Sequence, residues 1–152
     1  MGSNPTIISA AVSIKNSDLK PVFDRLRQLL APHASKFALA YDATDRYGLE
    51  APIGPATLRS WGGKARMPKI PIGWVEIRKA YVSYHLMGVD GNKKLLTTLS
   101  PPLRARMQGN ACFNFDAIDE TLMRELEKVT AESFAGMRRA GFIAPADGPR
   151  SD

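Results

Sequence analysis

The residues best suited to chemistry lie in the stretch 67–87, which holds one of the two tryptophans and one of the two histidines. If this stretch forms two strands joined by a short turn at Lys79-Ala80, antiparallel pairing places Trp74 opposite His85. Aromatic, hydroxyl, carboxylate and imidazole groups then share one face of the hairpin. The candidate ligand-binding residues on that face are Trp74, Glu76, Tyr81, Ser83 and His85.

Metal binding is one chemistry that this face could support. His85 and Glu76 form its best pair of ligands, but iron or zinc sites need several such groups at one point. The 15 acidic residues are spread along the chain, and the net charge of +6 opposes the capture of a cation. The sequence therefore predicts no cofactor, with iron as the alternative and His85 and Glu76 as its ligands.

Catalysis would require a nucleophile and a base. Cys112 and His85 could supply them if their strands are neighbours. A lone cysteine between Ala111 and Phe113 is, however, typical of a buried small hydrophobic residue. The sequence contains no nucleophile elbow, phosphate-binding glycine loop or zinc-hydrolase helix motif. These observations favour binding without catalysis, and no catalytic residue is predicted.

A second candidate site lies in the segment 52–71, whose four prolines and three glycines are expected to break regular structure. A basic loop with an aromatic residue could bind phosphate or a nucleic-acid base. The alternative is that the indole packs onto the loop itself. Whether this segment is a loop or contributes a strand is left open. The candidate anion-binding residues are Arg59, Trp61, Lys64 and Arg66.

The rest of the chain supplies the elements that position these residues. Apolar residues at helical spacing predict a helix from Asn16 that ends near Pro32, with His33 exposed beyond it. Strands are predicted at 37–41, 47–51, 74–78, 81–86 and 112–115. Short helices are predicted before and after Ser100. A last long helix is capped by Asp116 or Asp119, and its apolar stripe is predicted as Ile118, Leu122, Leu126, Val129, Ser133 and Met137.

Alternation within the strands assigns side chains to faces. One face of the hairpin is apolar throughout, with Val75, Ile77, Val82, Tyr84 and Leu86 directed to the core. Phe37, Leu39 and Tyr41 are expected to share a face, as are Tyr47, Leu49 and Ala51. The predicted fold is a two-layer α+β domain with a mostly antiparallel sheet of about five strands and helices on one face. The domain spans 16–143, between a flexible leader at 1–15 and a flexible tail at 144–152.

Two segments resemble a known family. They are Ala80–Met87, with the sequence AYVSYHLM, and Met107–Phe115, with the sequence MQGNACFNF, which Ile118-Asp119 and a leucine-rich helix follow. Both are similar to the YdhG-like family of small bacterial proteins, over roughly 37–137; the stretch before Met67 fits least well. The resemblance implies an antiparallel sheet backed by helices. Some relatives are described as intracellular iron chaperones, and the family supplies no catalytic motif.

These observations predict a cytoplasmic, non-catalytic module that binds a small ligand or a protein through the face bearing Trp74 and His85. A single cysteine excludes an intrachain disulfide and suits a reducing compartment, and no apolar run is long enough for a membrane span. A homodimer through the sheet is one form of such binding. The alternatives are an iron chaperone and, less favoured, nucleic-acid or phosphate binding by the 59–69 loop. An alternative of equal weight is that the 52–71 segment covers the rings of Trp74, Tyr81 and His85, so that this face binds nothing.

Overall fold

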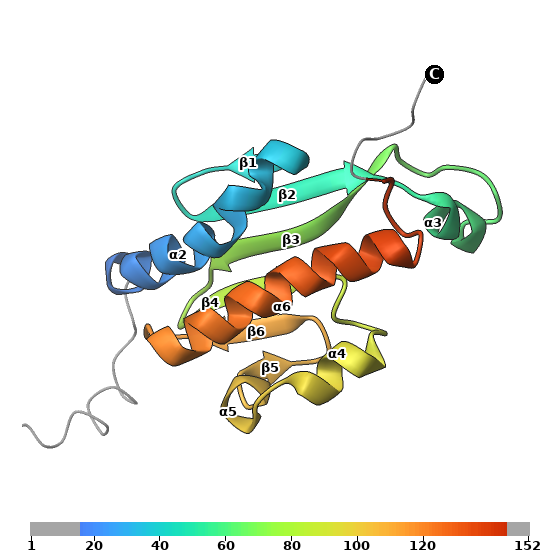
Figure 1. The fold of residues 1–152 in the computed structure, drawn as a ribbon. Helices are drawn as coiled ribbons and strands as arrows, with labels where there is room; N and C mark the ends of the chain where they lie inside the picture. The colour runs from blue at the N-terminus through green and yellow to red at the C-terminus, as the bar shows by residue number, and fades with distance from the viewer. Residues whose placement is uncertain (1–15, 146–152) are drawn as a thin grey trace, which may run out of the picture.

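The structure, a computed structural model, describes residues 16–145 (Figure 1). In chain order the elements are α2 (Asn16–Leu30), the 3-10 helix η1 (Ala31–Lys36), β1 (Ala38–Asp42), β2 (Arg46–Pro52), α3 (Pro55–Ser60), β3 (Lys69–Ile77), β4 (Val82–Leu86), α4 (Lys93–Thr98), α5 (Pro101–Arg104), β5 (Met107–Gln108), β6 (Cys112–Phe115) and α6 (Glu120–Arg139). The predicted leader at 1–15 and positions 146–152 of the predicted tail lie outside the described residues. None of the helices in the described part is long and apolar enough to cross a membrane.

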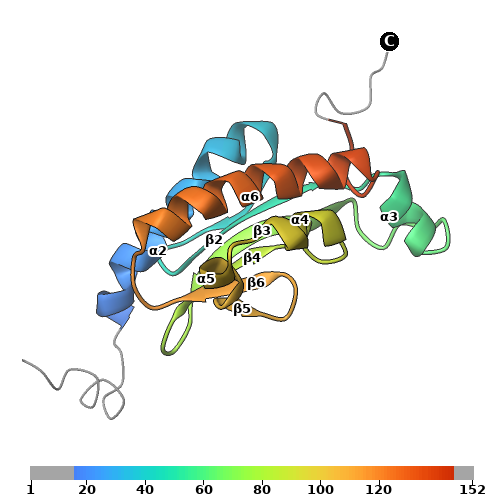
Figure 2. The same ribbon diagram turned by 60° about the horizontal axis from the view of Figure 1, so that its bottom comes forward.

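The strands form one six-stranded antiparallel sheet in the order β1-β2-β3-β4-β6-β5. The two long helices, α2 and α6, lie side by side over one face of it (Figures 1 and 2). The predicted two-layer α+β fold is therefore confirmed. The sixth strand, β5, has only two residues and was not predicted. Because both long helices cover the same face, neither of them covers the opposite face of the sheet.

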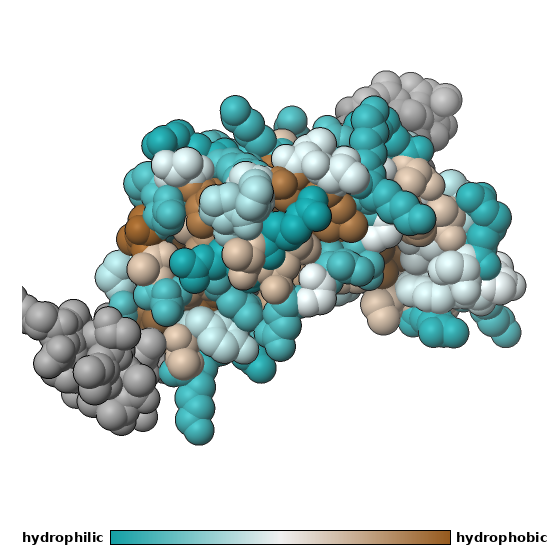
Figure 3. Space-filling model, turned by 90° about the horizontal axis from the view of Figure 1, so that it is seen from below, coloured by the Kyte–Doolittle hydropathy of each residue, from teal (hydrophilic) through white to brown (hydrophobic). Residues whose placement is uncertain are grey.

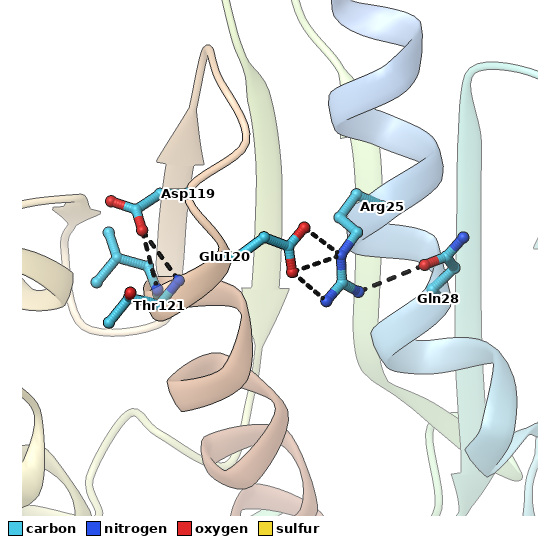
Figure 4. Close-up of polar contacts among 6 residues, drawn as sticks. Arg25, Gln28, Asp119, Glu120 and Thr121 are labelled. Atoms are coloured by element: carbon cyan, nitrogen blue, oxygen red, sulfur yellow. Dashed lines mark hydrogen bonds and ion pairs between the residues drawn. The ribbon is translucent and has the colours of Figure 1, made fainter.

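The helices form because their apolar residues recur at helical spacing and are buried between helix and sheet. In α2 the buried residues are Leu19, Val22, Phe23, Leu26, Leu29 and Leu30. Asp119 caps α6, where its carboxylate accepts from the amides of Thr121 at 3.1 Å and Leu122 at 3.3 Å. The adjacent Glu120 binds Arg25 of α2 through two guanidinium nitrogens (Figure 4). This ion pair joins the two helices at the surface.

A buried hydrogen bond ties the sheet to α6. The Tyr84 hydroxyl of β4 lies 2.6 Å from Thr130 Oγ1, which itself donates to the Leu126 carbonyl at 2.8 Å. Both Tyr84 and Thr130 are fully buried. Around them the core is apolar, and its largest fully buried aromatic side chains besides Tyr84 are Phe23, Phe113 and Phe115. Burial raises the pKa of the Tyr84 hydroxyl, because its charged form loses hydration.

The expectation that segment 52–71 lacks regular structure is wrong. It contains helix α3, and its last residues begin β3. Pro55 stands in the first turn of α3, where a missing amide costs nothing. The helix is held at the end of the sheet because the amides of Gly54 and Ala56 donate to the carbonyls of Phe142 and Gly141. Tertiary contacts with the distant end of the chain thus override the local proline signal.

Three smaller expectations also fail. Ile118 precedes α6 and is 43% exposed, so it does not belong to the helix stripe. His33 is half-buried and packs edge-to-face on Phe134, with the ring centroids 5.0 Å apart. A bulge between Leu39 and Tyr41 shifts the register, so these two side chains lie on opposite faces of the sheet. Tyr47, Leu49 and Ala51 do share the buried face.

The C-terminal boundary lies slightly beyond the predicted one. Ile143 bridges to Ile53, and the amide of Ala144 donates to the Pro52 carbonyl at 3.0 Å. Residues 144 and 145 were assigned to the tail. Ala144 therefore takes part in the hydrogen bonding of the domain.

Candidate functional site

The hairpin of β3 and β4 has the predicted register. Trp74 pairs with His85, Val75 with Tyr84, Glu76 with Ser83, and Ile77 with Val82. The Arg78 amide donates to the Tyr81 carbonyl at 2.7 Å and closes the two-residue turn at Lys79-Ala80. Val75, Val82, Tyr84 and Leu86 are buried under the helices, and Ile77 is partly buried. Trp74 and His85 therefore lie on the opposite face, which α2 and α6 do not cover; we call it the open face.

Trp74 and His85 are stacked on this open face. Their ring centroids are 4.5 Å apart and the ring planes differ by 12°. Both side chains are half-buried, so part of each ring faces solvent. The two rings occupy neighbouring strands at directly paired positions, which is the geometry that brings cross-strand side chains closest.

Polar side chains from β4 itself and from β6 surround the imidazole, and Ser83 among them is buried. His85 Nε2 lies 3.1 Å from Ser83 Oγ and 3.8 Å from Cys112 Sγ. The Cys112 thiol donates to Asn114 Oδ1 at 3.2 Å, and the Asn114 amide donates to Gln108 at 3.0 Å. We name Trp74, Ser83, His85, Cys112 and Asn114 the open-face cluster. It exists because β6 pairs with β4 and sets Cys112 opposite His85.

The other side of the indole meets a glycine and a tyrosine. Gly48 of β2 pairs with both Tyr41 and Trp74. A Cβ on Gly48 would lie 2.9 Å from the Tyr41 ring and 3.1 Å from Trp74 Cβ. The missing side chain lets Tyr41 lie over the sheet beside Trp74, and Arg46 covers the tyrosine ring at 4.5 Å. The rings of Tyr41, Trp74 and His85 thus form a row across strands β1 to β4, with Gly48 of β2 between the first two.

Two of the five predicted site residues contribute less directly. Glu76 forms an ion pair with Arg78, with Oε1 and Nη1 3.2 Å apart. Tyr81 lies in the turn between the strands and is partly exposed. The expectation that Cys112 is a core residue is wrong, because it is half-buried and belongs to the open face. Asn114 and Gln108 were not predicted. The alternation of polar and aromatic residues in 112–115 is a signal for Asn114, and no local pattern marks Gln108.

The surroundings of the cluster favour neutral side chains. Burial lowers the pKa of His85, with Glu76 opposing and Arg78 reinforcing the shift. Burial also raises the pKa of the Cys112 thiol, which Arg78 and Glu76 shift in opposite directions. An imidazole and a thiol at 3.8 Å with these shifts form a neutral pair at pH 7. A reactive thiolate needs the opposite shifts, so the geometry favours hydrogen bonding over nucleophilic attack.

We expect the fluorescence of Trp74 to report the protonation of His85. Replacing Trp61 by Phe leaves Trp74 as the only tryptophan. A protonated imidazole accepts an electron from an excited stacked indole more readily than a neutral one does, so emission should fall on acidification. Because burial lowers the pKa of His85, the midpoint is expected below the ordinary value of about 6.5. The measurement is a pH titration of the Trp61→Phe variant.

The control for this titration is the same variant carrying His85→Gln, which should show no such transition. The free energy of unfolding is also expected to fall on acidification. A histidine with a lowered pKa in the folded state binds its proton more readily when unfolded, so its contribution is complete above about pH 6.5 and is lost as the pH falls. Burial also lowers the pKa of His33, so both histidines act in this way. A midpoint of the emission transition above pH 6.5 would contradict the burial of His85 in the cluster.

Metal binding has little support in this arrangement. Within residues 16–145, no group of three or more His, Cys, Asp or Glu side chains comes together in a way that could hold a metal ion. His85 has Cys112 nearby, while Glu76 is engaged with Arg78. The iron hypothesis therefore has no ligand set in the part of the chain that the structure describes.

The basic loop is exposed at the end of the sheet. Arg59, Lys64 and Arg66 are exposed, and Arg66 lies over the half-buried Trp61 ring at 5.8 Å. The chain has no acidic residue between Glu50 and Glu76. Figures 1 and 2 show α3, which precedes the loop, beyond the end of the sheet and away from its centre. The loop's interaction with anions stays a prediction.

Comparisons of the chain with protein-family models, curated proteins and solved structures find no match. The resemblance to the YdhG-like family therefore stays a prediction.

Proposed function

We propose that this protein is a non-catalytic binding module that takes a small ligand or a protein segment on its open sheet face. The observation that carries this proposal is the half-exposed stack of Trp74 and His85 with hydrogen-bonding side chains beside it. Aromatic rings with polar neighbours are enriched where proteins bind ligands and partners. If the second face of this antiparallel sheet only faced water, it could carry ordinary charged side chains in place of these rings.

The chemistry of the cluster selects the bound group. Trp74 and His85 offer π surface, and Cys112 and Asn114 offer neutral donors and acceptors. Ser83 is buried and holds the imidazole through its hydroxyl. The lowered pKa of His85 and raised pKa of Cys112 indicate surroundings that disfavour charge. The nearest ions, Glu76 and Arg78, already pair with each other. The module is therefore suited to an uncharged planar group that can both stack and form hydrogen bonds, such as a heterocycle or a side-chain amide.

Titration with three neutral planar probes tests the proposal. Adenine, nicotinamide and indole are added to the Trp61→Phe variant, and Trp74 emission is followed. At least one probe is expected to bind saturably at millimolar concentration or below, and cyclohexanecarboxamide, which lacks a planar ring, is expected to bind more weakly. If none of the planar probes binds, or if binding survives in Trp74→Ala as judged by calorimetry, the open face is not a ligand site.

A second copy of the chain is one partner that could use the same face. Sedimentation of the wild-type chain over a range of concentrations identifies this case. Self-association that disappears in Trp74→Arg would assign the face to a homodimer.

A further inference from the structure

A groove separate from the open-face cluster lies at the C-terminal end of α6. It measures about 620 Å³, within the range of small-molecule sites of roughly 300 to 1,000 Å³. Its walls come from the start of β3, the turn after β4, the start of α4 and the end of α6. The space-filling view from below shows apolar surface in a hollow between hydrophilic side chains, on the side towards α3 (Figure 3).

The floor of the groove is apolar. Ile70, Met87, Met137 and Phe142 line it. Met87 is 41% exposed and Phe142 is 44% exposed, so two of the five large exposed hydrophobic residues among the described residues flank one groove. Clustered exposed apolar side chains are unusual on a protein surface and are typical of binding sites. An apolar ligand body would remove both from water.

Hydrogen-bond donors gather at one side of the groove, above Gly136. A Cβ on Gly136 would lie 3.2 Å from Asn92 Nδ2 and 3.6 Å from Arg139 Nη2. Asn92 Oδ1 accepts from the Leu95 amide at 3.0 Å, which fixes the amide group and directs Nδ2 away from this bond. No acceptor for Asn92 Nδ2 occurs among residues 16–145. Glycine at position 136 thus leaves room for two donors to approach.

The charges on the rim are mainly positive. Lys93 and Arg139 line the groove, with Asp90 as the one acidic lining residue. Lys93 takes part in no ion pair within the described residues. Arg139 pairs with Glu132 through Nη2, the same nitrogen that lies near Gly136, but the pair is on the surface, where it is weak. A guanidinium has five N–H donors, so most of them stay available to a ligand.

We propose that this groove binds a small amphipathic carboxylate, with its apolar chain on Met87 and Phe142 and its carboxylate at Asn92, Lys93 and Arg139. Asn92 Nδ2 has no acceptor and Lys93 has no ion-pair partner among the described residues, and a carboxylate supplies acceptors only. It is ionised at neutral pH and complements the two cations. An uncharged apolar molecule would leave the donors unpaired, and a cation would meet like charges. This site is independent of the open-face cluster.

Methionine-methyl NMR with octanoate tests the proposal. The methionines in the described part are Met67, Met87, Met107, Met123 and Met137, of which only Met87 and Met137 line the groove. Octanoate is expected to shift these two methyl signals saturably, while Met67 and Met107 stay in place. Octan-1-ol, which has the same chain and no charge, is expected to bind at least roughly tenfold more weakly, because bonds to a charged group are stronger.

Three variants show whether the donors act as proposed. Lys93→Gln with Arg139→Gln is expected to weaken octanoate binding at least roughly tenfold, whereas Lys94→Gln with Lys128→Gln removes the same charge outside the groove and should not. Asn92→Asp keeps the helix cap but replaces the free donor by an acceptor, so it should also weaken binding. Unshifted Met67, Met107 and Met123 signals in each free variant show that the fold is retained. Absence of saturable shifts at Met87 and Met137, or equal affinity for octan-1-ol, would overturn the proposal.

Discussion

Gly88→Ala is expected to destabilise the protein by about 3 kcal/mol or more, at the upper end of overpacking effects. Gly88 follows β4 and faces α6. A Cβ there would lie 2.5 Å from Ser133 Oγ and 2.8 Å from Met137 Cγ, and closer still to the Ser133 carbonyl oxygen. A backbone oxygen inside a helix cannot rotate away, so α6 must shift. Denaturant unfolding measures the loss as a lower midpoint with an unchanged slope.

Two other substitutions distinguish the steric clash at Gly88 from backbone strain and from an effect of the Ser133 hydroxyl. Gly91 has a positive φ of 81° but nothing near its Cβ position, so Gly91→Ala costs only the backbone strain of about 1 to 2 kcal/mol. Ser133 Oγ is buried without a hydrogen-bond partner in the described part of the chain, so Ser133→Ala should cost little. The account of this contact is wrong if Gly88→Ala destabilises no more than Gly91→Ala.

Thr130→Val is expected to destabilise the protein by about 1 to 3 kcal/mol, although the two side chains have nearly the same shape. Thr130 Oγ1 donates to the Leu126 carbonyl, so the Tyr84 hydroxyl is the donor in the bond between them. Removing Oγ1 leaves a buried Tyr84 hydroxyl with no partner. Removing the tyrosine hydroxyl instead leaves Thr130 bonded to Leu126. Tyr84→Phe is therefore expected to cost only about 0.5 to 1.5 kcal/mol.

The double variant decides between this account and simple loss of packing. Tyr84→Phe combined with Thr130→Val removes both groups and leaves no orphaned hydroxyl. Its free energy of unfolding should therefore lie near that of Thr130→Val or above it, rather than at the sum of the two losses. Additive losses would show that the two hydroxyls do not interact.

The hairpin could be predicted from the sequence because apolar and polar residues alternate in both of its strands and both alternations favour the same pairing. With a two-residue turn at Lys79-Ala80, the pairing puts Val75, Val82 and Tyr84 on the same face, and a slip by one residue would turn the charged side chains of one strand toward the core. Local pattern and burial therefore select the same pairing, and the structure shows it. The buried stripe of α2 was predictable for the same reason.

The open-face cluster was only half predictable. Trp74, Ser83 and His85 follow from the hairpin, because they lie within one local unit. Cys112 and Asn114 join it through the pairing of β4 with β6, which a long connection through α4 and α5 separates in sequence. Alternation assigns residues to faces but does not determine which strand lies beside which. The neighbour of His85 was thus beyond the reach of local patterns.

Irregular features and distant contacts account for the other failures. The bulge after Leu39 turns Tyr41 to the face of Trp74, and a bulge leaves no mark in the apolar pattern. The groove is formed by residues near positions 70, 90 and 140, which meet only in the folded chain. Neither the donors above Gly136 nor the exposure of Met87 could be inferred without the tertiary structure.

The most direct test of the binding module compares stability and probe affinity in Trp74→Ala. Because the indole is half-buried on an uncovered face, its removal should cost about 1 to 2 kcal/mol of stability, including the stack on His85. Affinity for the planar probe that binds the parent chain should fall at least roughly tenfold, since stacking contributes about 1 to 3 kcal/mol. A stability loss of about 3 to 5 kcal/mol, as for a core aromatic residue, or an unchanged affinity would contradict the proposed site.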